Sequence, residues 1–431
     1  MNSLRRMLGS NIRQYGMVLA LAAIVLYFQF RTDGVLLKPL NVSNLLTQNS
    51  YILILAIGMV MVIISRHIDL SVGSVAAFVG AVAAIMMTKW DLPWFVAVVL
   101  CLGLGALIGA WHGFWVAYVG IPAFIVTLAS MLIFRGLTLT VLNGETVANL
   151  PPQFEGMGNG FLPEIGPDTG LHNLTMLIGA AMSAFVVWIE FRRRASATRY
   201  QFDVAPRPLF LAKVALEVVV IMYFVYVLAQ YRGLPVVAVI LFALVGLYTF
   251  LMSRTVIGRQ IYAVGGNVDA ATMSGVRTRR IDFLVLTNMG MLAALAGMVF
   301  AARLTAANPK AGVNFELDAI AAAFIGGAAV TGGVGTVVGA IIGGFVMGVL
   351  NNGMSLRGVG IDWQQTIKGL VLLAAVAFDV YNKRRAAVGG GAGAEKENAA
   401  APPPPELEEQ LAELPDSLVT TTGTGDATAG T

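Results

Sequence analysis

The segment NSYILILAIGMVMVIISRHIDLSVGSVAAFVGAVAAIMM, residues 49–87, places a polar stretch between two apolar runs. The polar stretch is HIDLSVGS, from His67 to Ser74, and it contains a carboxylate, two serines and a glycine. A charge at the centre of a bilayer costs at least ~2.5 kcal/mol, so Asp69 needs a structural or functional reason if it lies close to membrane depth. Because irregular backbone survives at that depth only against protein or water, the segment predicts a broken or re-entrant helix.

The whole chain has the composition of an integral membrane protein. Its 431 residues are 57% hydrophobic and 12% charged, with a mean hydropathy of +0.77, whereas about a quarter of the residues in a soluble domain are charged. The apolar runs are long and unbroken, which favours helices over the short alternating strands of a barrel. We therefore expect an all-α, polytopic membrane protein with about 10–12 transmembrane or re-entrant helices.

Twelve apolar segments can be counted along the chain. They cover about 15–31, 50–65, 71–88, 93–118, 121–141, 173–190, 211–230, 235–252, 282–303, 318–332, 335–353 and 362–381. The segments within 50–88 and 318–353 are short, and glycine or polar residues separate their halves. This pattern is typical of broken or re-entrant helices.

Basic residues indicate how the chain is oriented. They cluster in the loop after the sixth segment (Arg192, Arg193, Arg194, Arg199), in the loop 253–281, and at 383–385. In a twelve-segment count these three clusters fall on one side, which the positive-inside rule assigns to the cytoplasm. Both termini are then cytoplasmic, and the loop 142–172, which has acids but no lysine or arginine, lies outside. The excess of basic charge follows this bias and indicates no nucleic-acid partner.

The composition changes near residue 386. Residues 1–385 form the expected membrane domain, and residues 386–431 are rich in Gly, Ala, Pro and Glu, with eight acids and one lysine. Such a segment has too few core-forming residues to fold. We expect a disordered, acidic cytoplasmic tail.

The polar stretch at 67–74 allows two interpretations that are compatible with each other. Asp69 can cap the helix that begins near Ser71, with Arg66 or His67 as a local partner. A helix end held open at membrane depth can also offer hydrogen-bond donors to a polar solute. Under the second interpretation Asp69, Ser71, Gly73 and Ser74 lie at a translocation pathway.

Two runs of glycine predict close helix packing. The trios are Gly105, Gly109, Gly113 and Gly335, Gly339, Gly343. A spacing of four places each trio on one helix face, where a second helix can approach closely. The sequences VGSV at 72–75 and VGTV at 334–337 each open an apolar run, which suggests that the chain contains two related halves.

The loop 253–281 predicts a short cytoplasmic helix. Gly265 and Gly266 are expected to form a turn, and Asn267 or Asp269 can cap the helix that follows. The sequence VDAATMSG, residues 268–275, has room for about two helical turns before Gly275 ends them. Such a helix can dock on a partner protein, or it can rest on lipid headgroups.

Common catalytic and nucleotide-binding motifs are absent from the sequence. The chain contains no Gly-Lys dipeptide, which a Walker A loop requires, and no HExxH or GxSxG motif. Its three histidines, His67, His112 and His172, are far apart in sequence. We therefore expect neither an enzyme nor a metal site.

Several of these stretches together resemble a known family. The motif IDLSVGS, the loop YAVGGNVDAATMSGV and the closing GGAAVTGGVGTVVGAIIGGFVMGVLNNGMSLRGVGIDWQQTIKGLVLLAAVAFDV are similar to permease subunits of bacterial binding-protein-dependent ABC sugar importers. The resemblance covers roughly residues 40–385, in order. YRGLP at 231–235 and GRQIYAVGGN at 258–267 are most similar to the xylose branch of the ribose, galactose and xylose group.

The resemblance implies a division of labour among several chains. Two permease copies, expected as a homodimer, would form the pathway in the bacterial inner membrane. A cytoplasmic ATP-binding subunit would hold ATP and Mg, so this chain would hold no cofactor. A periplasmic or lipid-anchored binding protein would deliver the monosaccharide. The expected sugar is xylose or a related pentose or hexose.

The family's ATPase-coupling pattern matches the loop 253–281. Its residues in this sequence are Gly265, Gly266, Asn267, Asp269, Ala270, Ala271, Ser274 and Gly275. The chain departs from the family at Arg66 and His67, where small or acidic residues are common, and in its acidic tail.

Two other classes remain open. An ion-coupled secondary sugar transporter or channel would use buried acids, for which Glu217, Asp318 and Asp379 are candidates beside Asp69. Lys213 precedes Glu217 by one turn, and the other two acids are expected near helix ends where they can reach water. A membrane enzyme or scaffold would need a clustered nucleophile or metal set, which the sequence does not offer.

Overall fold

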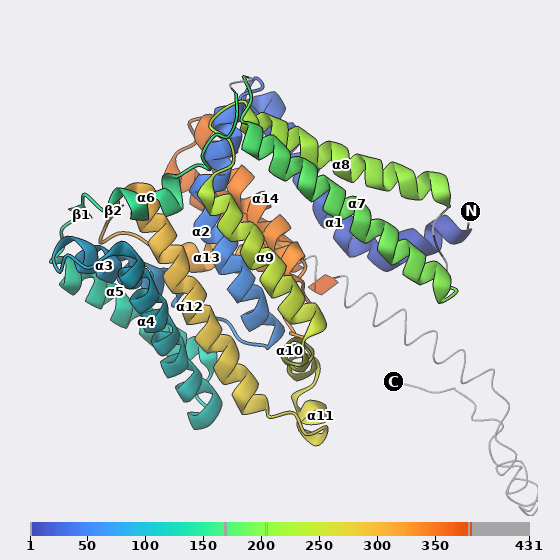
Figure 1. Cartoon of the computed structure of the whole chain (residues 1–431). Helices are drawn as coiled ribbons and strands as arrows, with labels where there is room; N and C mark the ends of the chain where they lie inside the picture. Colours follow the sequence, from blue (N-terminus) through green and yellow to red (C-terminus); the bar gives the residue numbers. More distant parts are fainter. Residues whose placement is uncertain (1, 168–169, 203, 205, 378–379, 382–431) are drawn as a thin grey trace, which may run out of the picture. The chain divides into compact units, whose positions relative to one another are not determined.

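The computed structural model describes residues 2–167, 170–202, 204, 206–377 and 380–381. By contacts the chain divides into two units, Met1–Val376 and Ala377–Thr431. The elements named below belong to the first unit (Figure 1). The expected tail at 386–431 lies outside the described residues.

The described residues are almost entirely helical. The helices are α1 (Asn2–Arg31), α2 (Pro39–Ile64), α3 (Val72–Thr88), α4 (Trp94–Phe114) with its π-helical extension η1 (Trp115–Val119), α5 (Ala123–Leu142), α6 (Pro152–Asn159), α7 (Asn173–Arg199), α8 (Arg207–Ala229), α9 (Val236–Arg254), α10 (Val256–Gly266), α11 (Val268–Met273), α12 (Thr278–Leu304), α13 (Phe315–Ile325) and α14 (Val337–Leu356). Residues 361–377 are also helical. Two short strands, β1 (Val147–Ala148) and β2 (Ala306–Ala307), pair antiparallel.

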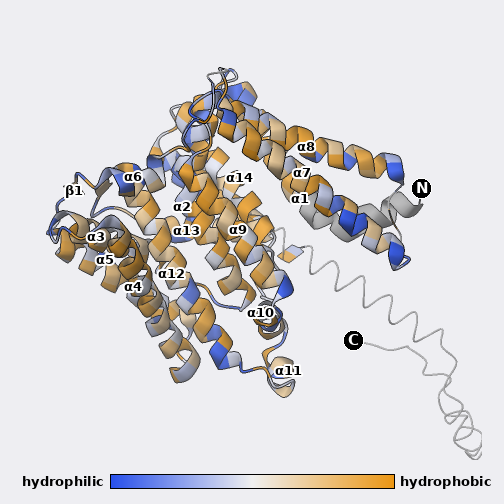
Figure 2. Cartoon of the chain, viewed as in Figure 1, coloured by the Kyte–Doolittle hydropathy of each residue, from blue (hydrophilic) through white to orange (hydrophobic). Residues whose placement is uncertain are grey.

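This architecture confirms the all-α, polytopic prediction. Within the described part of the chain, 8 helices are long and apolar enough to cross a membrane, and α3 is a shorter apolar helix. Figure 2 shows hydrophobic residues along most of the helix lengths, with hydrophilic residues gathered at helix ends and in loops. The predicted segment 318–332 is only partly helical, because α13 ends at Ile325 and Gly327 takes a positive φ of 83° in the turn that follows.

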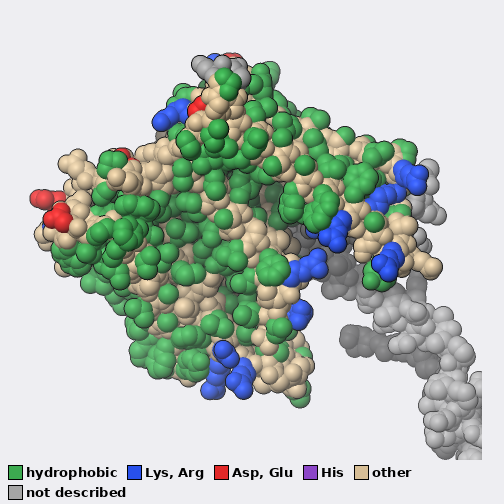
Figure 3. Space-filling view, viewed as in Figure 1, with side chains coloured by type: hydrophobic (Ala, Val, Ile, Leu, Met, Phe, Trp, Pro, Cys, Tyr) green, Lys and Arg blue, Asp and Glu red, His purple; other side chains and the backbone are tan. Residues whose placement is uncertain are grey.

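The helix bundle has two distinguishable ends. At one end α2, α4 and α9 finish and α12 and α14 begin; α10 and α11 lie here, so we name it the α11 end. The other end carries β1, β2 and α6, and we name it the β end. On the face drawn in Figure 3, Lys and Arg side chains lie at the α11 end and along the α7–α8 hairpin. The described residues of the loop 142–172, which are 142–167 and 170–172, lie at the β end, opposite the basic loop 253–281.

Helices α2 and α12 form the core. In α2, 89% of the apolar window is buried, and in α12 61%. Helix α12 packs against α4 by close backbone approach at Gly105, Gly109 and Gly113. A Cβ atom on Gly109 would lie 2.8 Å from the Thr287 backbone, and one on Gly113 3.0 Å from the Phe283 backbone. At Gly109 the three nearest atoms all belong to the main chain of α12, so they cannot move aside by a change of rotamer.

The second glycine trio divides between two contacts. Gly339 and Gly343 face α13, where their Cβ positions collide with the carbonyl oxygens of Gly326 and Ala322. Gly335 does not share that face, which corrects the sequence prediction. It precedes α14, whose N-cap is Thr336, and its Cβ position is 3.0 Å from the Ile64 side chain of α2.

Helices α7 and α8 form a hairpin with few contacts to the bundle. The hairpin's main packing is between its own two helices, and α8 also contacts α2. Only 17% of the apolar window of α7 and 22% of that of α8 is buried within the chain. Most of the hairpin surface is therefore left for lipid or for another protein.

Candidate functional site

The predicted helix break is present between α2 and α3. Residues 65–71 are not helical, and α3 begins at Val72. The predicted cap by Asp69 is not found, because the N-cap of α3 is Ser71 and no side chain bonds to the helix N–H groups that follow it. Asp69 instead fixes the turn before the helix: its Oδ1 atom accepts hydrogen bonds from the Ser71 backbone N–H at 2.8 Å and from the Ser71 hydroxyl at 2.6 Å. Asp69 is only 1% exposed.

The two serines of the break are also turned into the protein. Ser71 and Ser74 are fully buried, and the Ser74 hydroxyl donates to the Ser71 carbonyl at 2.8 Å. Neither side chain lines the small cavity between α3, α12 and the segment before α13. Their role at a translocation pathway stays a prediction.

Helix α13 begins deep inside the bundle, as α3 does. Its first residue, Phe315, stacks on Tyr51 with ring centroids 3.9 Å apart and packs edge-on against Phe300 at 5.0 Å. Tyr51 lies at the middle of α2, so α13 starts near mid-depth. The segment between β2 and α13 is therefore re-entrant from the β end.

The N-termini of these two half-length helices meet at Gly73. A Cβ atom there would collide with the carbonyl oxygen of Gly312 and with the Glu316 carboxylate. Only glycine permits this approach. Two helix N-termini, each a positive dipole end, thus converge inside the protein, which is the arrangement that membrane transporters use at binding sites.

Charged side chains surround this junction. The Arg135 guanidinium donates to the Ala311 carbonyl at 2.6 Å and to the Gly312 carbonyl at 3.3 Å. The Glu316 carboxylate is 8% exposed, and its Oε2 atom has no hydrogen-bond partner. Such a group is poised to accept a donor when the junction opens.

Asp318 is paired rather than open to water, which corrects the expectation from the sequence. Lys368, in the helix 361–377, donates to its Oδ1 atom at 2.9 Å, and the Asp318 side chain is 6% exposed. The reason is that α13 begins at depth, so a residue near its start is far from both bundle ends.

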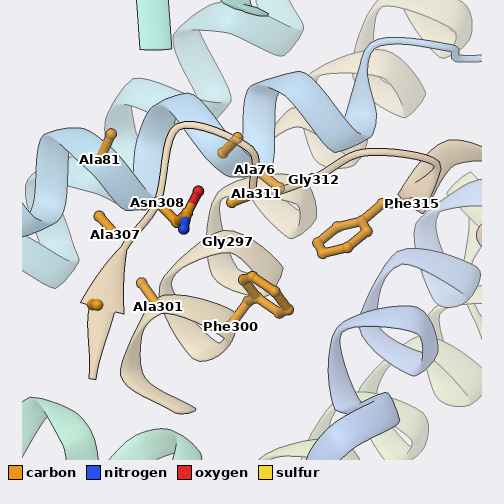
Figure 4. Close-up of a pocket in the computed structure, with 13 residues that line it drawn as sticks. Ala76, Ala81, Gly297, Phe300, Ala301, Ala307, Asn308, Ala311, Gly312 and Phe315 are labelled. Atoms are coloured by element: carbon orange, nitrogen blue, oxygen red, sulfur yellow. The ribbon is translucent and has the colours of Figure 1, made fainter. Parts of the chain in front are cut away.

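A small cavity lies beside the junction (Figure 4). Its volume is about 10 Å³, and it is lined by α3, α12 and the re-entrant segment. Its walls are Ala, Gly and Phe, and Asn308 is the one polar side chain among the lining residues. A site for a polyhydroxylated solute needs several convergent polar groups, so this cavity alone does not suit one.

The predicted loop helix is present as α11. Asn267 is its N-cap, and its side-chain oxygen accepts from the Ala270 N–H at 3.0 Å. Gly275 follows with a φ of 81°, and nothing lies within 4 Å of its Cβ position. The predicted turn at Gly265 and Gly266 is wrong, because both residues belong to the last turn of α10 and the turn falls at Asn267.

The outer face of α11 is open. Ala271 is 4% exposed and anchors the helix to the bundle, while Asp269, Ala270 and Ser274 are exposed. Met273 is 91% exposed. Ser274 is held by its own hydroxyl, which donates to the Ala270 carbonyl at 2.8 Å. A helix that presents an exposed methionine and a carboxylate offers a surface on which another protein can dock.

The sequence reasoning did not single out Arg135, Glu316 and Lys368. A signal for them existed, since each is a charged residue within a predicted apolar segment or directly before one. Their convergence on one junction could not be read from the sequence, because they are 52 to 233 positions apart (Glu316 to Lys368 and Arg135 to Lys368). In the described part of the chain no three His, Cys, Asp or Glu residues are grouped as a metal site would need.

Comparison with known proteins identifies the family. Residues 41–376 match the family described as branched-chain amino acid transport system / permease component. The chain is 42% identical to a xylose transport system permease protein of Haemophilus influenzae over 375 residues, 87% of this chain and 98% of that protein. It is 43% identical to the xylose transport system permease protein of Escherichia coli K12 over 378 residues, 87% of this chain and 93% of that one.

A more distant relative is the ribose import permease protein of Escherichia coli K12, 36% identical over 345 residues, 80% of this chain and 86% of that one. No solved structure matches. The chain belongs to this family of membrane transport permeases, and it is a multi-pass membrane protein.

Proposed function

We propose that this chain is the permease subunit of an ATP-driven importer that carries a monosaccharide, with xylose as the first candidate. The relation to xylose permeases carries the proposal: it extends over 98% of one relative's length, so the whole membrane domain is shared. The sequence adds that the chain has no Gly-Lys dipeptide and hence no Walker A loop. A separate ATP-binding subunit would bind ATP and Mg.

The ATP-binding subunit would dock on the α11 end. The face formed by Asp269, Ala270, Met273 and Gly275 is exposed there, and Asn267 fixes the start of α11. The α11 end carries the basic loop 253–281, and the positive-inside bias places such a loop in the cytoplasm. Both termini would then be cytoplasmic, and the β end would receive the sugar-binding protein.

The pathway would run between two copies of the chain. Within one copy, Asp69, Ser71 and Ser74 are buried and bonded to each other. The small apolar cavity beside them offers too few polar groups for a sugar. A route lined by this junction therefore needs a rearrangement of the half-helices α3 and α13 next to a second copy, which supports a homodimer.

An ion-coupled transporter is the second candidate. It would need buried carboxylates free to exchange protons or ions. Glu217 lies 3.5 Å from Lys213, and Asp318 is bonded to Lys368, so both are neutralised by lysines. Asp379 lies outside the described residues. Glu316 remains as the one candidate acid of the junction with an unbonded oxygen.

Uptake in proteoliposomes tests the proposal. The chain is reconstituted with its ATP-binding subunit and sugar-binding protein, and labelled xylose, ribose, glucose and arabinose are supplied with and without ATP. We expect ATP-dependent uptake of one of these sugars, with xylose the most rapid. Uptake by the chain alone under a proton gradient would overturn the proposal in favour of the ion-coupled transporter.

A variant of Gly275 tests the docking face. Gly275→Asp places a charge on an open position whose φ aspartate tolerates better than most residues, so the fold is retained. We expect the ATP-binding subunit to be lost from the purified complex, because the new carboxylate would be buried without a partner. Gly144→Asp is the matched control, since Gly144 has a φ of 73° and equally open surroundings at the β end. Equal recovery of the subunit with both variants would contradict the assignment of the docking face.

A further inference from the structure

Arg66, two residues after the end of α2, has an unusual backbone conformation. Arg66 takes a φ of 69°, in the left-handed region that glycine usually occupies. Its N–H bonds to the Ile63 carbonyl at 3.0 Å, and the His67 N–H bonds to the Val62 carbonyl at 3.0 Å. This pair of bonds is the Schellman motif, in which glycine is the common residue at the position of Arg66. An arginine in this strained position calls for a role of its side chain.

The Arg66 side chain binds the end of α10. Its Nε atom donates to the Gly265 carbonyl at 2.9 Å, and its Nη2 atom donates to the Gly266 carbonyl at 3.0 Å. These are the last carbonyls of α10, which have no partners within the helix and form its negative dipole end. A forked guanidinium can bond both at once, which a lysine ammonium does less well.

The same side chain also reaches the loop before α14. Nε lies 3.3 Å from the Thr331 carbonyl, and the Gly333 N–H bonds to the Ile64 carbonyl at 2.9 Å. Gly332 leaves room for the arginine, because a Cβ atom there would collide with Arg66 Cγ. Arg66 thus joins three elements, the end of α2, the end of α10 and the loop 326–335.

His67 contacts the chain after α11, at the start of α12. Its Nε2 atom lies 3.2 Å from Asp282 Oδ1, in the second turn of α12, at ion-pair distance but without hydrogen-bond geometry. Helix α11 lies between Gly266 and Thr278. Arg66 and His67, both within the break, therefore contact the chain immediately before and shortly after α11.

The opposite side of α10 is fixed to the same loop. The Tyr262 hydroxyl donates to the Gly335 carbonyl at 2.7 Å. Burial raises the pKa of the Tyr262 phenol, so this donor keeps its proton across the physiological range. If α10 moves, the end of α2 and the loop 326–335 must move with it, or these bonds break. Helix α11 follows α10 directly in the chain, so it moves together with α10.

We propose that Arg66, assisted by His67, is the positioning residue that transmits movement of α10 and α11 to the helix break at 65–71. It contacts neither sugar nor nucleotide. A displacement of α11 by its docked partner pulls on Arg66. The strained backbone at Arg66 passes the displacement to Asp69, three residues further on, and to the start of α3 at Val72. This inference rests on the proposed function and assigns the coupling within it to a residue outside the docking face.

Arg66→Gly separates this role from a structural one. Glycine is the preferred residue at this backbone position, so the variant keeps the end of α2 and loses only the side chain. In the reconstituted importer we expect the ATP-binding subunit to co-purify and basal ATP hydrolysis to stay within about twofold of the native level. Sugar transported per ATP falls about tenfold, within the range typical of coupling energies. Arg66→Lys restores part of the ratio, because it keeps the charge but lacks the fork.

Arg259→Ala is the matched control. Arg259 is an exposed arginine on the same helix, α10, and its removal leaves the ratio unchanged. A native ratio of sugar to ATP in Arg66→Gly overturns the inference, as does loss of the ATP-binding subunit, which would indicate a docking role. Absence of ATP-dependent uptake in the native importer would instead sink the proposed function.

Hydrogen exchange on the full-length chain without partners gives an independent readout. In Arg66→Gly we expect faster exchange both at 262–277 and at 65–72, since each segment loses its connection to the other. Faster exchange confined to 65–72 would mean that Arg66 acts locally, and the inference would fail even if transport were impaired.

Discussion

Helix pairs α4–α12 and α7–α8 are both membrane-length, yet they are held together differently. In the α4–α12 pair, main chains meet at glycines, and the atoms next to Gly109 belong to the backbone of Leu286 and Thr287. In the α7–α8 pair, the atoms nearest to a Cβ on Gly179 belong to the side chain of Val225 and not to its main chain. Lipid offers no hydrophobic driving force between helices, so close packing carries the α4–α12 interface.

Ion pairs add to the packing in the α7–α8 hairpin. The Lys213 ammonium bonds to Glu190 at 2.7 Å and lies 3.5 Å from Glu217, and Arg193 lies 3.6 Å from Glu190. Flexible charged side chains tolerate small shifts, whereas main-chain contacts do not. We therefore expect the α4–α12 pair to tolerate less change in helix position than the α7–α8 hairpin.

The largest expected effect is a break of the rigid pair. Gly109→Leu puts a branched side chain where even a Cβ atom lies 2.8 Å from the α12 backbone. We expect a loss of stability at or above ~3 kcal/mol, because overpacking against a main chain cannot be relieved by rotamers. Thermal unfolding in detergent, followed by tryptophan fluorescence, measures it.

Gly103→Ala is the control on the same helix. Nothing lies within 4 Å of its Cβ position, and alanine favours a helix by about 0.5–1 kcal/mol over glycine. Its stability should equal or exceed that of the native chain. If both substitutions were tolerated alike, close backbone approach would not be what holds α4 to α12.

A smaller effect is expected at the break within the bundle. Asp69→Ala removes the acceptor of the Ser71 N–H and hydroxyl bonds and leaves a buried N–H without a partner, which costs about 1–3 kcal/mol. We expect impaired sugar uptake with normal recovery of the ATP-binding subunit, since Asp69 lies away from α11. Asp69→Asn keeps an oxygen that can accept both bonds and should retain most uptake. If it were as inactive as Asp69→Ala, the charge of Asp69 and not its hydrogen bonds to Ser71 would be its function.

The smallest effect is expected in the hairpin. Lys213→Met removes the cation between Glu190 and Glu217 and keeps an unbranched apolar side chain of similar length. Because the lysine is 50% exposed, we expect a change below ~1 kcal/mol in the same unfolding measurement and no change in uptake. A loss as large as that of Gly109→Leu would show that the hairpin is as rigid as the bundle.

Much of the fold could be predicted from residue patterns alone. Apolar length and the glycine spacing at 105–113 predicted the helices, and the polar residues of 67–74 predicted the break. The patterns failed where geometry depends on a second segment. Gly335 shares the spacing of Gly339 but precedes the helix, and Gly265 resembles a turn residue but lies within α10, where its missing side chain admits the Ile64 carbonyl.

The sequence by itself determined that this is a helical membrane protein with an interrupted helix and a short exposed helix after Asn267, because hydropathy, capping and backbone preferences are local properties. Only the tertiary structure decided that α3 and α13 start against each other at Gly73, that Lys368 neutralises Asp318, and that Arg66 spans about 200 positions of sequence to hold α10. These contacts join segments distant in the chain. They are set by how the helices pack, which no local pattern encodes.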